Sequence, residues 1–385
     1  VAYLFAHNNN DGGFGENGDQ DVIKCGSYTG NGSGNGPSIN LGFEPQWVMV
    51  KRYDNNGDWN MFDIERGFAL GDNDHNHKIN SGGIDQSSQN WIDPTPTGFK
   101  LTNSNAHVNG SGDKYLYTAI RKGPLNIPTD ATKVFKSVIY TGSNNNTHDT
   151  GFKLDFSINT QGFNTSNTTP KYTATRLLGE GAYLQTHALS ATGSGATEWF
   201  KTKTNHINVN TSWWGNTSDV ISWNWRRAPN YFDIVPYDGT GSTQTVSHNL
   251  GVKPEMMWVK NRDSNENWVV YHKAIGATYH LRLNADAAKI GSQTRFNDTE
   301  PTSSVFTVAT DSDVNDNNDT YLAHLFASVD GVSKVGSWSG NGGSNQTIDC
   351  GFSSGARLVL MKRSDGADHW YLFDSMQGIA DGSAD

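Results

Sequence analysis

The sequence predicts an all-β protein made of tandem β-sandwich or jelly-roll-like repeats of about 100 residues each. Three observations support this fold class: a composition rich in turn-forming polar residues, a high aromatic content, and short motifs that recur along the chain. A chain of 385 residues also exceeds what one hydrophobic core usually supports, so several domains are expected.

The composition favours short strands and many turns over helices. Only 18% of the residues are charged and 42 are Gly, so much of the polarity comes from Gly, Asn, Ser and Thr. The 12 Trp, 17 Phe and 14 Tyr residues need a hydrophobic core or a partner, which argues against a disordered chain.

Charge and hydropathy exclude two kinds of partner. A formal charge of −10 and a pI of 5.6 argue against binding to nucleic acid, which requires a face rich in Lys and Arg. No segment approaches the roughly 18 consecutive apolar residues of a membrane-spanning helix, so membrane insertion is not expected.

Internal repetition is the strongest signal in the sequence. The motif SYTGNG at residues 27–32 returns as SWSGNG at residues 337–342, with looser copies between them. The aromatic residues at its centre are spaced by 112, 97 and 101 residues, and they are Tyr28, Tyr140, Tyr237 and Trp338.

A second landmark is a Lys at the end of an apolar strand, followed by a Trp eight residues later. It occurs three times, as Lys51 with Trp59, Lys260 with Trp268, and Lys362 with Trp370. Recurrence at a fixed offset indicates an architectural role. We therefore expect the three Trp residues to occupy equivalent positions and to pack in cores, with the Lys stems covering apolar surface.

These landmarks divide the chain into repeats. Residues 23–123, 124–230 and 231–331 are predicted as three β repeats, and residues 332–385 as the first half of a fourth. The second repeat is divergent because it lacks the Lys–Trp pair. Residues 1–22 are predicted to contain the closing strand of a preceding repeat and an Asn/Gly/Asp-rich loop.

The unmatched ends allow two hypotheses. The chain is part of a longer array, which we favour, or the first strand of one molecule completes the last repeat of another by strand addition.

Strands are expected throughout each repeat. Residues 46–51 and 255–260 are apolar between their polar end residues, which predicts strands covered on both faces. Residues 274–288 are the only stretch with a helical pattern.

Three long runs carry a family resemblance: DVIKCGSYTGNG at residues 21–32, VSHNLGVKPEMMWVKNR at residues 246–262 and LFASVDGVSKVG at residues 325–336. They resemble an uncharacterised repeat domain of long virion structural proteins of marine bacteriophages, which are usually described as tail fibres. The resemblance covers nearly the whole chain. It implies a virion structural protein, a tail or head fibre segment whose loops serve host attachment. It supplies no catalytic or binding residues.

A non-enzymatic role is expected, since the sequence contains no catalytic or phosphate-binding motif. Two alternatives remain: a bacterial extracellular adhesin or filament subunit, and a polysaccharide depolymerase, which would combine aromatic residues with two carboxylates. The expected partners are a host cell-surface glycan or other virion proteins, and a homo-oligomer in a virion or in the extracellular space is expected.

One candidate carbohydrate site is the pair Trp213 and Trp214, which lies in a loop rich in Ser, Asn and Gly. An exposed indole can stack on a sugar ring while nearby amides reach the hydroxyl groups. The alternative is that one or both Trp residues fill a core.

Calcium is the one cofactor that the sequence suggests. Closely spaced oxygen donors with intervening Gly residues suit Ca²⁺, and two loops offer them: the first has Asp11, Asp19 and Asp21, the second Asp311 and Asp313. Neither loop matches the twelve-residue calcium-binding pattern, and turns rich in Asn and Asp are common without metal, so we favour solvated turns with no cofactor and keep calcium as the alternative.

Overall fold

The computed structural model describes residues 1–9, 11–71, 73–83, 85–141, 146–161, 170–179, 181–194, 206–209, 219–343, 345–376 and 378. Strands dominate these residues and the helices are single turns, which confirms the predicted all-β fold. No helix in the described part is long and apolar enough to cross a membrane. The chain forms two compact units, one centred on residues 1–126 and the other containing most of residues 127–385.

The first unit contains a two-layer β-sandwich, here called repeat 1. A three-stranded sheet of β2 (Ser38–Asn40), β7 (Gly98–Leu101) and β6 (Ile92–Thr95) packs on a five-stranded sheet. Side chains of both sheets, such as Val48 and Phe99, share one core. The larger sheet is antiparallel, and its strands in spatial order are β1 (Ile23–Thr29), β8 (Lys114–Arg121), β3 (Pro45–Arg52), β4 (Trp59–Asp63) and β5 (His77–Lys78). A 3₁₀ turn, η1 (Ile64–Arg66), follows β4.

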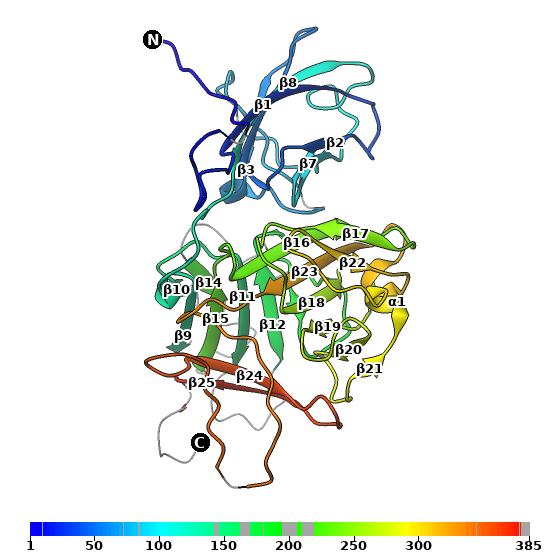
Figure 1. Ribbon diagram of the computed structural model, residues 1–385. Helices are drawn as coiled ribbons and strands as arrows, with labels where there is room; N and C mark the ends of the chain where they lie inside the picture. The colour runs from blue at the N-terminus through cyan, green and yellow to red at the C-terminus, as the bar shows by residue number, and fades with distance from the viewer. Residues whose placement is uncertain are drawn as a thin grey trace. The chain divides into compact units, whose positions relative to one another are not determined.

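The second unit uses the same strand order twice. Repeat 2 has the order β9 (Phe135–Thr141), β15 (Asp219–Trp225), β11 (Phe156–Gln161), β12 (Lys171–Thr175) and β13 (Leu184–Gln185). Repeat 3 has β16 (Phe232–Asp238), β23 (Thr320–Phe326), β18 (Met256–Asn261), β19 (Val269–His272), β20 (Tyr279–Arg282) and, at the edge, β21 (Ile290–Gly291). Figure 1 labels these strands, apart from β13, within the second unit.

Smaller elements complete these two repeats. Repeat 2 adds η2 (Ala131–Lys133) and the pair β10 (Asn146–Asp149) and β14 (His206–Val209). Repeat 3 adds the pair β17 (Gln244–Ser247) and β22 (Val305–Val308), and the short helices α1 (Gln293–Phe296) and α2 (Ser312–Asn315). The predicted helical stretch at 274–288 is wrong, because β20 lies inside it and pairs with β19. The buried Leu281 is fixed by that pairing, and tertiary contacts override a weak helical preference.

The last segment forms an antiparallel hairpin of β24 (Leu358–Lys362) and β25 (Trp370–Asp374), drawn in orange-red and red in Figure 1. At the other end, residues 1–8 form no strand, and the side chains of Val1, Tyr3 and Leu4 are exposed. The pairing of this predicted closing strand with a sheet stays a prediction.

The expectation of strands covered on both faces holds for repeat 3 and fails for repeat 1. Five of the six residues of β18 are buried. One face of β18 points into the repeat's own core, and the other packs against repeat 2, where the Phe156 ring lies 6.4 Å from Trp258. In β3 only Pro45, Val48 and Val50 are buried, because the outward side chains of this strand lack a comparable cover.

Candidate functional site

The Lys–Trp motif is a hairpin in which the two residues face each other across neighbouring strands. Lys51 pairs with Trp59 on β3 and β4, and Lys362 pairs with Trp370 on β24 and β25. The register of β18 and β19, which pairs Val259 with Val269, continues to Lys260 and Trp268. The prediction that the three Trp residues occupy equivalent positions is therefore confirmed.

The lysine of the motif holds the hairpin loop. Lys51 Nζ donates to the carbonyl of Gly57 at 2.5 Å, and Lys260 Nζ donates to that of Glu266 at 2.8 Å. Both acceptors lie six residues after the lysine. The ammonium group thus replaces water as the donor to a turn carbonyl, while the aliphatic part of the Lys side chain lies along the sheet.

In repeat 3 this hairpin also contacts repeat 2. The Ala191 N–H donates to Asn265 Oδ1 at 3.0 Å, and three further hydrogen bonds define the contact. Trp268 Nε1 donates to the Gln185 carbonyl at 2.8 Å, and Lys260 Nζ donates to the Leu189 carbonyl at 2.8 Å. The third bond runs the other way, since the Thr192 N–H donates to the Arg262 carbonyl at 2.7 Å. The hairpin of repeat 3 is therefore joined to one turn of repeat 2.

The same three bonds recur between repeat 3 and the β24–β25 hairpin. Trp370 Nε1 donates to the Arg282 carbonyl at 2.8 Å, and Lys362 Nζ donates to the Asp286 carbonyl at 3.1 Å. The Lys289 N–H donates to the Ser364 carbonyl at 2.9 Å. The repeat 3 residues in these bonds each lie 97 residues after their counterparts in repeat 2. The three pairs are Gln185 and Arg282, Leu189 and Asp286, and Thr192 and Lys289. We call this set of contacts the Lys–Trp joint, made between a donor hairpin and the acceptor turn of the preceding repeat.

Burial differs among the three Trp residues of the motif. Trp268 is fully buried, as predicted, and Trp370 is partly buried, whereas the prediction of core packing is wrong for Trp59, which is 41% exposed. The physical reason is that Trp268 is covered by the acceptor turn of repeat 2, and the motif Trp is a joint residue rather than a residue of its own core. Repeat 2 keeps the strand order with Lys171 at this position, which pairs with the following strand as Trp268 does.

Charged groups lie beneath the joint in repeat 3. Burial lowers the pKa of Lys260 to about 8, although Glu266 and Asp313 oppose this. Burial, and next the hydrogen bond with Asp313, raise the pKa of Glu266. Arg295 Nη2 donates to Asp313 Oδ2 at 2.6 Å and neutralises that buried carboxylate. The ion pair of this cluster is therefore the one between Arg295 and Asp313.

Two histidines of repeat 3 are held neutral. Burial lowers the pKa of His324 to about 3, and its ring lies 4.5 Å from that of Phe156. Burial, and then the charges of Arg295 and Arg282, lower the pKa of His280 to about 4.

The β24–β25 hairpin has a second anchor in Asp374. This buried carboxylate accepts hydrogen bonds from Trp223 Nε1 at 2.8 Å and from Ser137 Oγ at 2.6 Å, both in repeat 2. The hairpin therefore binds both earlier repeats of the second unit.

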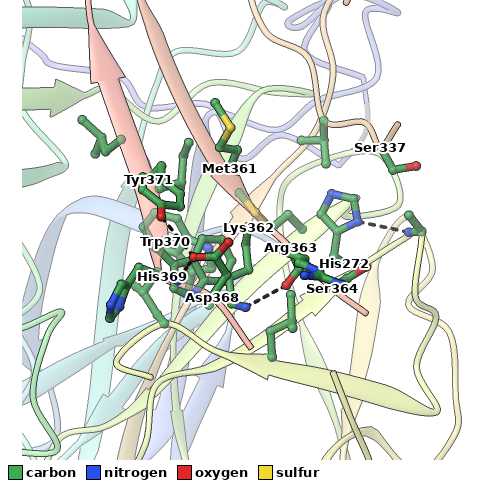
Figure 2. Close-up of a pocket in the computed structure, with 18 of the residues that line it drawn as sticks. His272, Ser337, Met361, Lys362, Arg363, Ser364, Asp368, His369, Trp370 and Tyr371 are labelled. Carbon is green, nitrogen blue, oxygen red and sulfur yellow. Dashed lines mark hydrogen bonds between the residues drawn. The ribbon is translucent and has the colours of Figure 1, made fainter. Parts of the chain in front are cut away.

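A cavity of about 1480 Å³ lies in the second unit, and Figure 2 shows part of its lining around Lys362 and Trp370. Repeat 2 contributes Ile158 to the lining, repeat 3 contributes Trp258, and the hairpin contributes Leu360. Its volume exceeds the roughly 300–1,000 Å³ of ordinary small-ligand pockets. The cavity is thus a gap among three repeats rather than a pocket shaped around one ligand.

Two carboxylates that line this cavity do not suit a catalytic acid. Asp365 accepts from Arg363 at 2.8 Å, and this hydrogen bond lowers the pKa of Asp365. A hydrogen bond from the His369 N–H lowers the pKa of Asp368, and a second one from the Tyr371 hydroxyl lowers it further. A glycosidase needs one carboxyl group with a raised pKa to protonate the leaving group, and both of these stay ionised at neutral pH.

The first predicted calcium loop does not gather its three carboxylates into a metal site in the structure. Asp11 Oδ1 accepts from the Asn9 N–H at 2.9 Å, and Asp21 pairs with Lys24 at 2.7 Å. Asp19 lies in the same loop, with its backbone next to the bridge between Phe14 and Gln20.

In the second calcium loop, Asp311 and Asp313 both pair with Arg295. Among the described residues, no three His, Cys, Asp or Glu side chains form a group that could hold a metal. Calcium binding therefore stays a prediction, with ion pairing as the competing use of the second loop. Trp213 and Trp214 lie outside the described residues.

Comparison with known families assigns the chain to one family. A family model described as "Domain of unknown function (DUF7483)" matches residues 1–124 and 130–382. The chain belongs to this family. A search of curated proteins finds no match. The break in the DUF7483 match falls beside the boundary between the two compact units at residue 126.

In this DUF7483 chain the sequence pattern predicts the donor half of the joint but not the acceptor half. The acceptors Gln185, Leu189, Arg282 and Asp286 contribute backbone carbonyls, which every residue type carries, so no side-chain motif marks them. The fixed 97-residue spacing between the two turns was the available signal.

Proposed function

We propose that this chain is a non-enzymatic structural segment of a phage virion, part of a tail or head fibre that displays loops for host attachment. The observation that carries the proposal is the Lys–Trp joint, which recurs with the same three hydrogen bonds at two successive junctions. The three sequence runs that resemble virion repeat proteins supply the biological setting.

A joint of this kind suits an extended array. Repeat 3 carries both a donor hairpin for the preceding repeat and an acceptor turn for the following hairpin, so repeats of this kind can be added without a new kind of contact. In such quasi-one-dimensional proteins stability is approximately a sum over repeats and nearest-neighbour interfaces, and length is set by repeat number.

Host attachment would use the Asn- and Gly-rich loops rather than the joints, since the polar groups of the joints already hydrogen-bond to one another. We propose a cell-surface glycan or another virion protein as the partner, with Trp213 and Trp214 as the residues to test for glycan stacking. A Trp213→Ala/Trp214→Ala double variant should lose glycan-array binding while keeping its melting temperature. Unchanged binding would remove these two residues from the proposal.

The virion assignment is tested by immunogold electron microscopy with antibodies raised against this chain. Label on fibres of purified phage particles is expected. Label confined to the surface of uninfected bacterial cells would contradict the proposal and favour an extracellular adhesin or filament subunit, which the same joint would also serve.

Enzymatic and calcium-dependent versions are tested with the same purified chain. Incubation with host capsule or lipopolysaccharide should release no new reducing ends. Release that disappears in a chain with Asp365→Asn and Asp368→Asn would overturn the non-enzymatic assignment. A melting temperature that rises with Ca²⁺ and falls with a chelator would support calcium in the loops, and Asp11→Asn and Asp311→Asn would then identify which one.

A further inference from the structure

Repeat 1 carries a complete donor hairpin, and among the residues that the structure describes it makes none of the joint contacts of its counterparts. Trp59 is 41% exposed and Leu116, opposite Lys51, is 47% exposed. Their counterparts in repeat 3, Trp268 and Leu322, are both fully buried. Among the described residues the Trp59 ring contacts Lys51, whose Nζ lies 6.0 Å from the ring centroid.

The third group of this face is also in place. Tyr53 corresponds to Arg262, because both N–H groups donate to the strand that closes the repeat, at the carbonyls of Lys114 and Thr320. The Arg262 carbonyl accepts the Thr192 N–H in the joint. Tyr53 is 53% exposed, whereas Arg262 is buried. Trp59, Lys51 and Tyr53 together form the donor face of repeat 1.

Repeat 1 also carries the acceptor turn. The bridge between Asn76 and Gln86 closes residues 78–85, as the bridge between Tyr183 and Gly193 closes the acceptor turn of repeat 2. His280 and Ile290 close the turn of repeat 3 in the same way. By this alignment, the Lys78 and Gly82 carbonyls correspond to those of Gln185 and Leu189, and the Asp85 N–H corresponds to that of Thr192.

The acceptor turn of repeat 1 is open in the described part of the chain. The Lys78 carbonyl accepts only the Ser81 N–H of its own turn, at 3.1 Å, whereas the Gln185 carbonyl accepts both its turn N–H and the Trp268 indole. Residues 79–83 are exposed. One repeat therefore presents both halves of a joint that is made twice elsewhere in the same molecule.

We propose that the donor face of repeat 1 binds the acceptor turn of repeat 1 in a second copy of this chain. Trp59 Nε1 then donates to the Lys78 carbonyl of the other copy, Lys51 Nζ donates to its Gly82 carbonyl, and its Asp85 N–H donates to the Tyr53 carbonyl. The two surfaces are different, so the contact is head-to-tail and open-ended rather than a closed dimer. This inference rests on the joint geometry alone and does not depend on the virion assignment.

The contact is expected to be weak between free molecules. Three hydrogen bonds and the burial of one Trp side chain must offset the translational and rotational freedom that two molecules lose on association. The experiment therefore uses the full chain in two forms, free and as two copies joined by a flexible Gly/Ser linker, which raises the effective concentration to about the millimolar range.

Sedimentation equilibrium of the free chain should show a weight-average mass that rises above 42.1 kDa with concentration. The Trp59→Lys variant, which installs the residue that repeat 2 carries as Lys171, should remain monomeric. The matched control is Trp338→Lys, which replaces a Trp that is 49% exposed outside repeat 1 and should associate like the parent chain.

The linked form gives a second readout through oxidative labelling of Trp59, quantified by mass spectrometry. Because one of the two copies has its donor face covered, total Trp59 labelling should fall about twofold relative to the free chain at low concentration, while Trp338 labelling is unchanged. Equal Trp59 labelling in both forms overturns the proposal. Association that survives Trp59→Lys also overturns it, since the contact then lies elsewhere.

Discussion

Repeat 1 and repeat 3 share a strand order and a Lys–Trp hairpin, yet the same Trp is 41% exposed in one and fully buried in the other. The difference does not arise inside the sandwich, because both repeats have complete cores of their own. It arises from the neighbour: Trp268 lies against the acceptor turn of repeat 2. An aromatic residue that recurs at a fixed position can therefore serve the contact between repeats and not the fold of each repeat.

The largest expected effect distinguishes these two Trp residues. Trp268→Ala should lower the free energy of unfolding of the second unit by about 3–5 kcal/mol, because it empties a fully buried site and leaves the Gln185 carbonyl without its donor. Trp59→Ala should change the first unit by about 0.5 kcal/mol or less. Urea unfolding of both variants measures this, and equal losses would contradict the comparison.

Ion pairs give a second contrast of nearly the same size. Arg295→Ala in repeat 3 should cost about 3–5 kcal/mol, because it leaves the carboxylate of Asp313 buried without its partner. Arg52→Ala in repeat 1 should cost distinctly less, because its pair with Asp113 is closer to water. If Ca²⁺ can replace Arg295 as the cation beside Asp313, adding calcium would restore the stability that Arg295→Ala removes.

Acid should weaken the second unit through His324 and His280. The folded pKa values of about 3 and about 4 lie below the unfolded value near 6.5, so the unfolded chain binds more protons as the pH falls. The stability that comes from keeping these two histidines neutral is fully present above about pH 6.5 and is lost as the pH falls toward 3–4. The loss is about 1.4 kcal/mol for each unit that separates the folded from the unfolded pKa.

The control for this pH effect is His324→Phe, which keeps an aromatic ring beside Phe156 and removes the titrating group. Urea unfolding at pH 7 and pH 5 should show a smaller loss of stability on acidification in this variant than in the parent chain. An identical loss would exclude His324 as a source.

Much of the fold was predictable from the sequence, because the hairpin motif, the strand pattern and the repeat spacing all come from side-chain identity. The equivalence of Trp59, Trp268 and Trp370 followed from their offset alone. Their burial did not, because it depends on a neighbouring repeat. The 274–288 helix prediction failed because its local pattern was weaker than the pairing of β20 with β19.

The candidate site was only half predictable for a related reason. The donors of the joint are side chains with a recognisable spacing, whereas the acceptors are backbone carbonyls placed by turn geometry. Asp374 gave no signal either, because its partners Trp223 and Ser137 lie 151 and 237 residues earlier in the chain.

Amide hydrogen exchange of the full chain carrying Trp370→Lys tests most directly whether the motif Trp joins one repeat to the next. The Lys289 N–H donates to Ser364 across the altered junction, and the Thr192 N–H donates to Arg262 across the intact one. The account predicts that Lys289 loses its protection while Thr192 keeps it. Protection of Lys289 that survives the substitution, or equal loss at both amides, would contradict the claim that each junction is held by its own Trp.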